Sequence, residues 1–206
     1  MAEQGTVNPW VVGSNPTSPA MKIIDNFITQ QEQEDFEEYV STTNFPYRLY
    51  RSHRFSSEVD QRWTHAPLQM SHHLYEAESD KASPHLPIIR KFTKKLEIEF
   101  GKVQLIRAKV NLSFPYPPMM NYEHQVPHID LQYDNGDPVD HKVLLYYINP
   151  SDGPTYFFDE LYRVTDEIYP KQGRAVIFDG SQIHAASNPV KNPFRFVLNV
   201  DFKIGG

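Results

Sequence analysis

Hydrophobic positions in the first part of the chain follow a helical period. Apolar residues over 21–27 predict a first strand or lead-in. Thr29 and Glu32 then have the spacing of a capping box, in which hydroxyl and carboxylate satisfy each other's backbone donors. Apolar residues recur at helical spacing directly after them, so the sequence predicts a short helix over about 30–42.

A second helical stripe follows after a polar stretch. Ser83 is the expected N-cap and Pro84 the expected first helical residue, and Gly101 closes the helix. The intervening residues 43–82 are polar, and we expect them to be irregular, as a solvated loop or as the lining of a substrate cleft. Residues 1–20 are predicted to form a loose arm.

The pattern changes at Val103, where short runs of β-branched and aromatic residues alternate with turn residues. These runs predict strands over 103–114, 126–133, 142–149, 155–158, 162–169, 174–179 and 194–203. Short strands at this spacing are typical of a sandwich or barrel. We therefore expect an α+β protein, with a single domain over 21–206 in which helical support from 21–102 packs on a β-rich core over 103–204.

Composition narrows the possible chemistry. The formal net charge of −6 disfavours a nucleic-acid partner. The chain has no cysteine, so a metal would need nitrogen and oxygen ligands, and its nine histidines can supply the nitrogen. We find no secretory signal and no apolar run long enough to span a bilayer, which predicts a cytoplasmic protein without a membrane partner. The oligomeric state is not predicted.

Candidate metal ligands lie on two of the predicted strands. His128 and Asp130 are two residues apart, so in a strand both project from the same face. Such a pair also occurs often by chance, as an exposed or hydrogen-bonded pair. His184 follows an apolar strand and a turn, where a barrel mouth would be. Two histidines and one carboxylate on one face would form the facial triad of non-haem iron(II) oxygenases, with open positions for other ligands.

Arg195 lies near the start of the last predicted strand, shortly after His184. A guanidinium on an otherwise apolar strand needs a partner, because burying it alone is costly. A bidentate carboxylate is a natural partner. Taken in isolation, such an arginine more often forms a structural salt bridge or is exposed.

Taken together, these residues resemble the prolyl 4-hydroxylase-like branch of the iron(II)/2-oxoglutarate-dependent oxygenases. The resemblance covers about 103–203, and its signature is a His-x-Asp, a distal histidine and a basic residue beyond it. Here these are His128, Asp130, His184 and Arg195. The resemblance implies a double-stranded β-helix (jelly-roll, cupin-like) core and a triad that binds Fe(II).

The resemblance also implies roles in 2-oxoglutarate binding. Arg195 would hold the tail carboxylate, and Tyr147 and Thr155 match positions near it. Asn111 is a further candidate, although a structural turn contact is as good an explanation. The tyrosine that often precedes the His-x-Asp has no single counterpart. Three residues compete for that place: Ser113, Tyr116 and Tyr122.

The implied activity is a dioxygenase reaction. It would hydroxylate an unactivated C–H and release succinate and CO2, with Fe(II), 2-oxoglutarate and O2 required and ascorbate as a candidate reductant. A prolyl or other peptidyl or amino-acid substrate is the first expectation. Alternatives are oxidation of a small molecule or nucleic acid, or a catalytically silent β-helix that binds a metal or partner. Among the other histidines, His124 is given a surface or substrate role and His141 is expected to be exposed.

Overall fold

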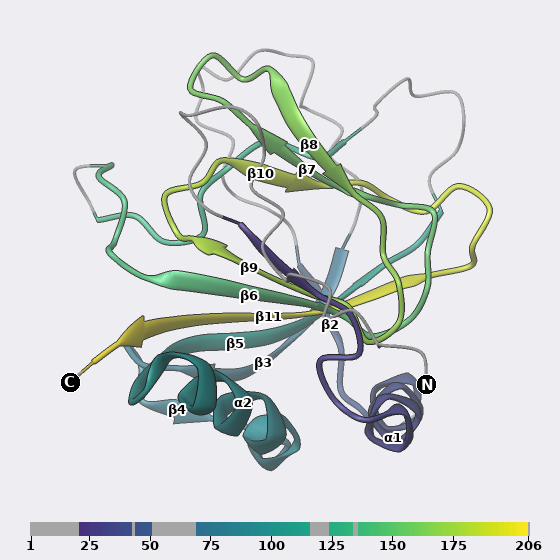
Figure 1. Cartoon of the computed structure of the whole chain (residues 1–206). Helices are drawn as coiled ribbons and strands as arrows, with labels where there is room; N and C mark the ends of the chain where they lie inside the picture. Colours follow the sequence, from purple (N-terminus) through teal and green to yellow (C-terminus); the bar gives the residue numbers. More distant parts are fainter. Residues whose placement is uncertain (1–20, 43, 51–68, 116–123, 134–135, 206) are drawn as a thin grey trace, which may run out of the picture.

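The structure is a computed structural model. It describes residues 21–42, 44–50, 69–115, 124–133 and 136–205. Two sheets face each other, and the helices lie on the far side of the larger one (Figure 1). The predicted N-terminal arm, residues 1–20, lies outside the described residues.

An eight-stranded sheet and a three-stranded sheet make up the β structure. The larger sheet has the order β1-β9-β6-β11-β5-β3-β2, with β4 paired to β3, and the smaller has the order β10-β7-β8. All pairings are antiparallel. The strands are β1 (Lys22–Ile24), β2 (Arg48–Tyr50), β3 (Gln69–Glu76), β4 (Lys81–Ala82), β5 (Val103–Ser113), β6 (Lys142–Tyr147), β7 (Thr155–Phe158), β8 (Val164–Ile168), β9 (Ala175–Asp179), β10 (His184–Ala186) and β11 (Arg195–Ile204).

The first predicted helix is confirmed as α1 (Gln30–Ser41). Thr29 is its N-cap, and the reciprocal hydrogen bonds between Thr29 and Glu32 form the expected capping box. The side chains of Phe36 and Val40 are buried beneath the helix. Local backbone chemistry and the apolar stripe therefore specify the same helix.

The second helix begins later than the sequence predicts. A 3-10 turn, η2 (Leu86–Ile89), leads into α2 (Arg90–Phe100), which ends at Gly101 in the left-handed region with φ 80°. Pro84 therefore precedes the helix, and the Ser83 hydroxyl accepts a hydrogen bond from the His85 N–H within the preceding turn.

No helix among the described residues is long and apolar enough to cross a membrane.

Two strand predictions need correction. Within residues 43–82, which were expected to be irregular, β2, β3 and β4 extend the larger sheet beyond β5. The predicted strand over 126–133 is reduced to two isolated bridges, at His128 and Gln132. The other predicted strands are found with boundary shifts of a few residues, whereas β10 was not predicted as a strand.

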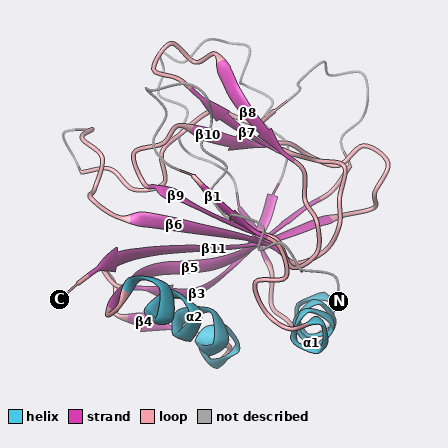
Figure 2. Cartoon of the chain, viewed as in Figure 1, coloured by secondary structure: helices cyan, strands magenta, loops and turns pink. Residues whose placement is uncertain are grey.

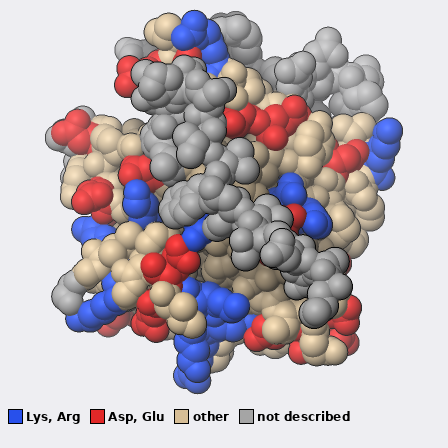
Figure 3. All heavy atoms as spheres, in the orientation of Figure 1, with Lys and Arg blue, Asp and Glu red and all other residues tan. Residues whose placement is uncertain are grey.

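The larger sheet separates two hydrophobic cores. The helices cover one face of this sheet (Figure 2). One core lies between this face and the helices and includes Phe92 of α2. The other lies between the two sheets and contains Val143, Leu145 and Phe157. Adjacent residues of one strand enter different cores, as Tyr146 contacts the helices while Tyr147 points between the sheets. On the face shown in Figure 3, acidic and basic side chains of the described residues are intermixed.

We expect Phe92→Ala to lower the free energy of unfolding by about 3–5 kcal/mol. The Phe92 ring is fully buried and lies within 4.7 Å of the Tyr146 ring centroid and 5.2 Å of the Phe36 centroid, so truncation leaves a cavity between α1, α2 and β6. Ile98→Ala is a matched control on the same helix. Its side chain is 82% exposed, and its substitution should change stability by less than about 0.5 kcal/mol in urea denaturation. Equal effects of the two changes would contradict this packing.

Candidate functional site

Two backbone hydrogen bonds hold His128 and His184 directly opposite each other. Each N–H donates to the carbonyl of the other residue at 2.9 Å, in an isolated antiparallel bridge. This bridge adds the segment around His128 to the edge of the smaller sheet at β10. Directly opposed residues project from the same face, and the two imidazole centroids are 4.9 Å apart.

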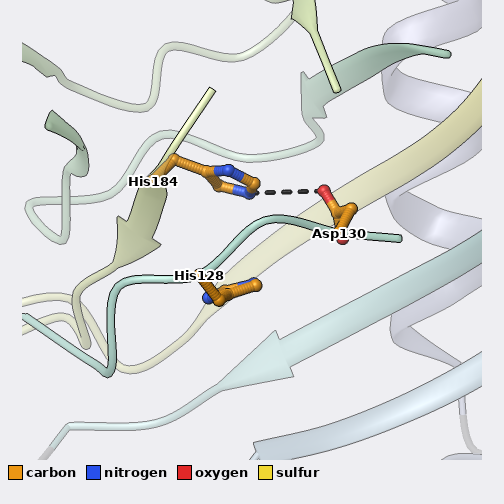
Figure 4. A group of neighbouring side chains, drawn as sticks. All are labelled: His128, Asp130 and His184. Atoms are coloured by element: carbon orange, nitrogen blue, oxygen red, sulfur yellow. Dashed lines mark ion pairs between the residues drawn. The ribbon is translucent and has the colours of Figure 1, made fainter. Parts of the chain in front are cut away.

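Asp130 completes a cluster with the two histidines (Figure 4). One ligand atom from each side chain can be chosen so that all lie within 4.8 Å of one another. His184 Nε2 is 3.3 Å from Asp130 Oδ2. Ligands at right angles on an ion that is about 2.1 Å from each would lie about 3 Å apart. The structure thus brings together the three residues that the sequence nominated.

Neighbouring carbonyls orient both imidazoles. The Nδ1 atoms of His128 and His184 lie 2.9 and 3.0 Å from the carbonyl oxygens of Val126 and Gln182. A carbonyl only accepts, so each Nδ1 carries the hydrogen and each Nε2 presents a lone pair. Second-shell carbonyls of this kind commonly fix histidine metal ligands.

The ligand atoms of this cluster need a positive charge between them. The Nε2 lone pair of His184 faces a carboxylate oxygen of Asp130, and both are buried. Two facing acceptors repel unless a proton or a metal cation lies between them. Burial raises the pKa of Asp130. A proton on His184 Nε2 would let this ring donate to Asp130, and that hydrogen bond, with the nearby Lys109 and Arg107, would hold the pKa of Asp130 well below its ordinary value. The donor set therefore fits a divalent metal.

Arg195 is buried between the two sheets. Its Nε donates to the Gly153 carbonyl and its Nη2 to Thr155 Oγ1, both at 2.8 Å. The guanidinium carbon is 5.6 Å from the ring centroid of Tyr147, whose hydroxyl donates to the same Thr155 oxygen at 2.8 Å. Arg195, Tyr147 and Thr155 are thus brought together.

No carboxylate of the described residues forms an ion pair with Arg195, although its side chain is only 3% exposed. Burial lowers the pKa of the Arg195 guanidinium, and the electrostatic and hydrogen-bonding interactions with Tyr147 offset this only in part. A buried charge without an opposite charge is costly, so the Arg195 guanidinium is chemically suited to a carboxylate from a bound molecule.

The remaining candidates take different positions. Asn111 lies on β5, in one row across the sheet with Val197 and Tyr147, and its side chain is half-buried. Ser113, one of the three residues that compete for the tyrosine position, is fully buried opposite Arg195. The other two competitors, Tyr116 and Tyr122, lie outside the described residues.

Two other histidines can now be placed. His124 packs against the rings of Tyr156 and Phe158 on β7, with centroids 5.5 and 4.9 Å away, and is not part of the metal cluster. The expectation that His141 is exposed is wrong. Its side chain is fully buried, because it lies against Gly180 and 3.6 Å from the carboxylate of Asp201.

The sequence did not predict which side chains hydrogen-bond to Asp130. Arg107 Nη2 donates to Asp130 Oδ1 at 2.7 Å, and Asn199 Nδ2 donates to Oδ2 at 3.2 Å. A usable signal was present, since Arg107, Lys109 and Asn111 alternate with buried apolar residues on β5. That alternation predicts a polar face of β5 turned toward the site.

Comparisons with known proteins were made at the level of sequence and of structure. No family model matches the sequence, and no curated protein matches it. A Burkholderia pseudomallei oxidoreductase of the 2OG-Fe(II) oxygenase family has a TM-score of 0.63 and 12% identity, covering 92% of this chain and 87% of that chain.

Two further solved structures show how widely this fold is used. A prolyl hydroxylase from Trichoplax adhaerens, in complex with a hypoxia-inducible-factor peptide fragment, has a TM-score of 0.60 and 12% identity, with 89% of this chain and 83% of that chain covered. The non-haem α-ketoglutarate-dependent epimerase SnoN from nogalamycin biosynthesis has a TM-score of 0.60 and 10% identity, with 90% and 78% covered. The chain therefore has the double-stranded β-helix fold of the 2OG-Fe(II) oxygenases, as its resemblance to their prolyl 4-hydroxylase-like branch implied.

Proposed function

We propose that this protein is an iron(II)- and 2-oxoglutarate-dependent dioxygenase that hydroxylates an unactivated C–H. One observation carries the proposal. The space between the two sheets contains both a cluster of two imidazoles and a carboxylate and a buried arginine that has no ion-pair partner among the described residues. Arg195 and Asn199 lie on the same face of β11, and Asn199 contacts Asp130. A bound dicarboxylate that reaches from the metal to Arg195 would supply a metal ligand at one end and an ion-pair partner for the guanidinium at the other.

Three residues would bind the metal. His128, Asp130 and His184 would hold Fe(II) and leave three coordination positions for cosubstrate and dioxygen. The bound iron would supply the oxidising chemistry that couples decarboxylation of 2-oxoglutarate, to succinate and CO2, with hydroxylation of the substrate.

Other side chains would bind the cosubstrate and exclude water from it. Arg195, with Tyr147 and Thr155, would bind the distal carboxylate through charge-assisted hydrogen bonds. Buried Phe157 and Val197 would keep that end dry, which strengthens the interaction. Asn111 is placed to add a polar contact from β5.

For the substrate, we propose a prolyl or other peptidyl or amino-acid residue. The support is the resemblance to the prolyl 4-hydroxylase-like branch and the peptide complex of the Trichoplax enzyme. A small-molecule substrate is the second candidate, because the epimerase SnoN has the same fold. The net charge of −6 disfavours nucleic acid. Succinate release measured with proline-containing peptides, free amino acids and small hydroxylatable compounds would separate these classes.

A catalytically silent metal- or partner-binding protein is the remaining alternative. Such a protein would have no need of a buried arginine that forms no ion pair among the described residues, nor of a buried His-Asp-His cluster, because each arrangement costs stability. The two proposals differ in a simple observable, since a silent protein would not turn over 2-oxoglutarate.

Anaerobic addition of Fe(II) and 2-oxoglutarate should produce a visible metal-to-ligand charge-transfer band. His128→Ala and Asp130→Ala should each abolish it, because each removes a ligand from the cluster. His124→Ala is the matched control and should retain the band, as this histidine packs on β7 outside the cluster. A wild-type protein that gives neither a band nor succinate would refute the proposed activity.

Arg195→Ala should weaken 2-oxoglutarate binding at least about tenfold, since hydrogen bonds between charged groups contribute about 1.5–3 kcal/mol. Fe(II) affinity should stay close to that of the wild type, because Arg195 contacts Gly153 and Thr155 and none of the three ligands. Tyr147→Phe removes only the hydroxyl and should cause a smaller loss of the same kind. Calorimetric titration of each ligand separates the effects, and a collapse of iron affinity with intact cosubstrate affinity would reverse the assignment.

A further inference from the structure

A chain of buried charges continues behind Asp130, away from the metal position. Arg107 of β5 donates through Nη2 to Asp130 Oδ1 and through Nε to Asp201 Oδ2, each at 2.7 Å. Asp201 lies directly across from Arg107 on β11, and its second oxygen is 3.6 Å from His141 Nε2. At that distance the His141–Asp201 pair is a charge contact rather than a hydrogen bond.

This chain is expensive to bury. Asp201 and the His141 side chain are fully buried and Asp130 is 1% exposed. Withdrawing charges from water costs several kcal/mol per ion, and buried ion pairs are often replaceable by apolar residues without loss of stability. Fold stability alone is therefore a weak reason for the arrangement.

The geometry distinguishes the two oxygens of Asp130. Oδ1 receives the short hydrogen bond from Arg107 and has Lys109 Nζ at 3.8 Å. Oδ2 accepts a longer hydrogen bond from Asn199 Nδ2, at 3.2 Å, and lies 3.3 Å from His184 Nε2. A carboxylate is free to bind a metal through one oxygen or through both. Oδ1 is thus held by the guanidinium, and Oδ2 is the oxygen next to His184.

We propose that Arg107 is a positioning residue that makes Asp130 a one-oxygen ligand, and that Asp201 and His141 hold Arg107 in the required orientation. The inference rests on the proposed metal site. Binding through both oxygens would fill one of the three positions that cosubstrate and dioxygen need, so Arg107 keeps that position open.

The far end of the chain is fixed by close packing. His141 Nδ1 is 2.6 Å from the Val139 carbonyl, and the Gly180 N–H donates to the His141 carbonyl at 2.8 Å. A Cβ added to Gly180 would lie 2.1 Å from the imidazole, so only glycine leaves room for the ring. The absence of a side chain at Gly180 thus allows the imidazole to lie next to Asp201, and the network ends at the turn that contains Gly180.

The test compares Arg107→Leu with the double variant Arg107→Leu/Asp201→Leu. The single change leaves the buried Asp201 with His141 as its remaining charge contact and should destabilise the fold. The double change removes both charges of the Arg107–Asp201 pair and should recover part of the lost thermal stability. Both variants should bind Mn(II), used in place of iron, about 10- to 100-fold more weakly than the wild type, as expected when an outer-shell partner is lost. Phe92→Ala is the control for lost stability, and its Mn(II) affinity should not change.

A second readout reports the binding mode of Asp130. Water-proton relaxation of the Mn(II)-loaded protein counts coordinated water, and the double variant should hold one water fewer than the wild type because the freed Oδ1 also binds the metal. Unchanged Mn(II) affinity and water count in the double variant would overturn the role of Arg107 while leaving the proposed activity intact. Failure of the wild type to bind Mn(II) or Fe(II) would instead refute the metal site itself.

Discussion

The site depends on the forced proximity of electron donors that repel one another. The bridge between His128 and His184 fixes the two backbones, and carbonyl partners at Nδ1 turn both Nε2 lone pairs inward. Buried Asp130 adds a carboxylate oxygen to the same small volume. Such a cluster is stable only around positive charge, so the fold stores a strong preference for a cation at one point.

One face of the larger sheet presents the side chains of the site, and the other face packs against the helices and stabilises the fold. Along β11, Phe196 and Leu198 pack toward the helices, while Arg195 and Asn199 point between the sheets. The same alternation separates Tyr146 from Tyr147 on β6. A register slip of one residue would exchange core and site on every strand, which is why the helix-facing core must be well packed for the site to exist.

Much of this could be predicted from the sequence, because alternation and spacing are local signals. Most strands after Val103 follow from them, and so does the choice of His128, Asp130 and His184, which the structure brings together. β3 was missed since Gln69–Glu76 is polar, and its pairing with β5 comes from the tertiary structure. Pairings between distant residues escape such reasoning, and the most consequential one joins Arg107 of β5 to Asp201 of β11. The burial of His141 escaped it too, because that depends on the room left by Gly180.

The most direct test of the account is the position of the metal. Anomalous diffraction at the iron edge, from crystals loaded with Fe(II) without oxygen, should show one peak within bonding distance of His128 Nε2, His184 Nε2 and Asp130 Oδ2, with no fourth protein ligand. A peak held by other residues, or closed off by an additional side chain, would contradict the central claim.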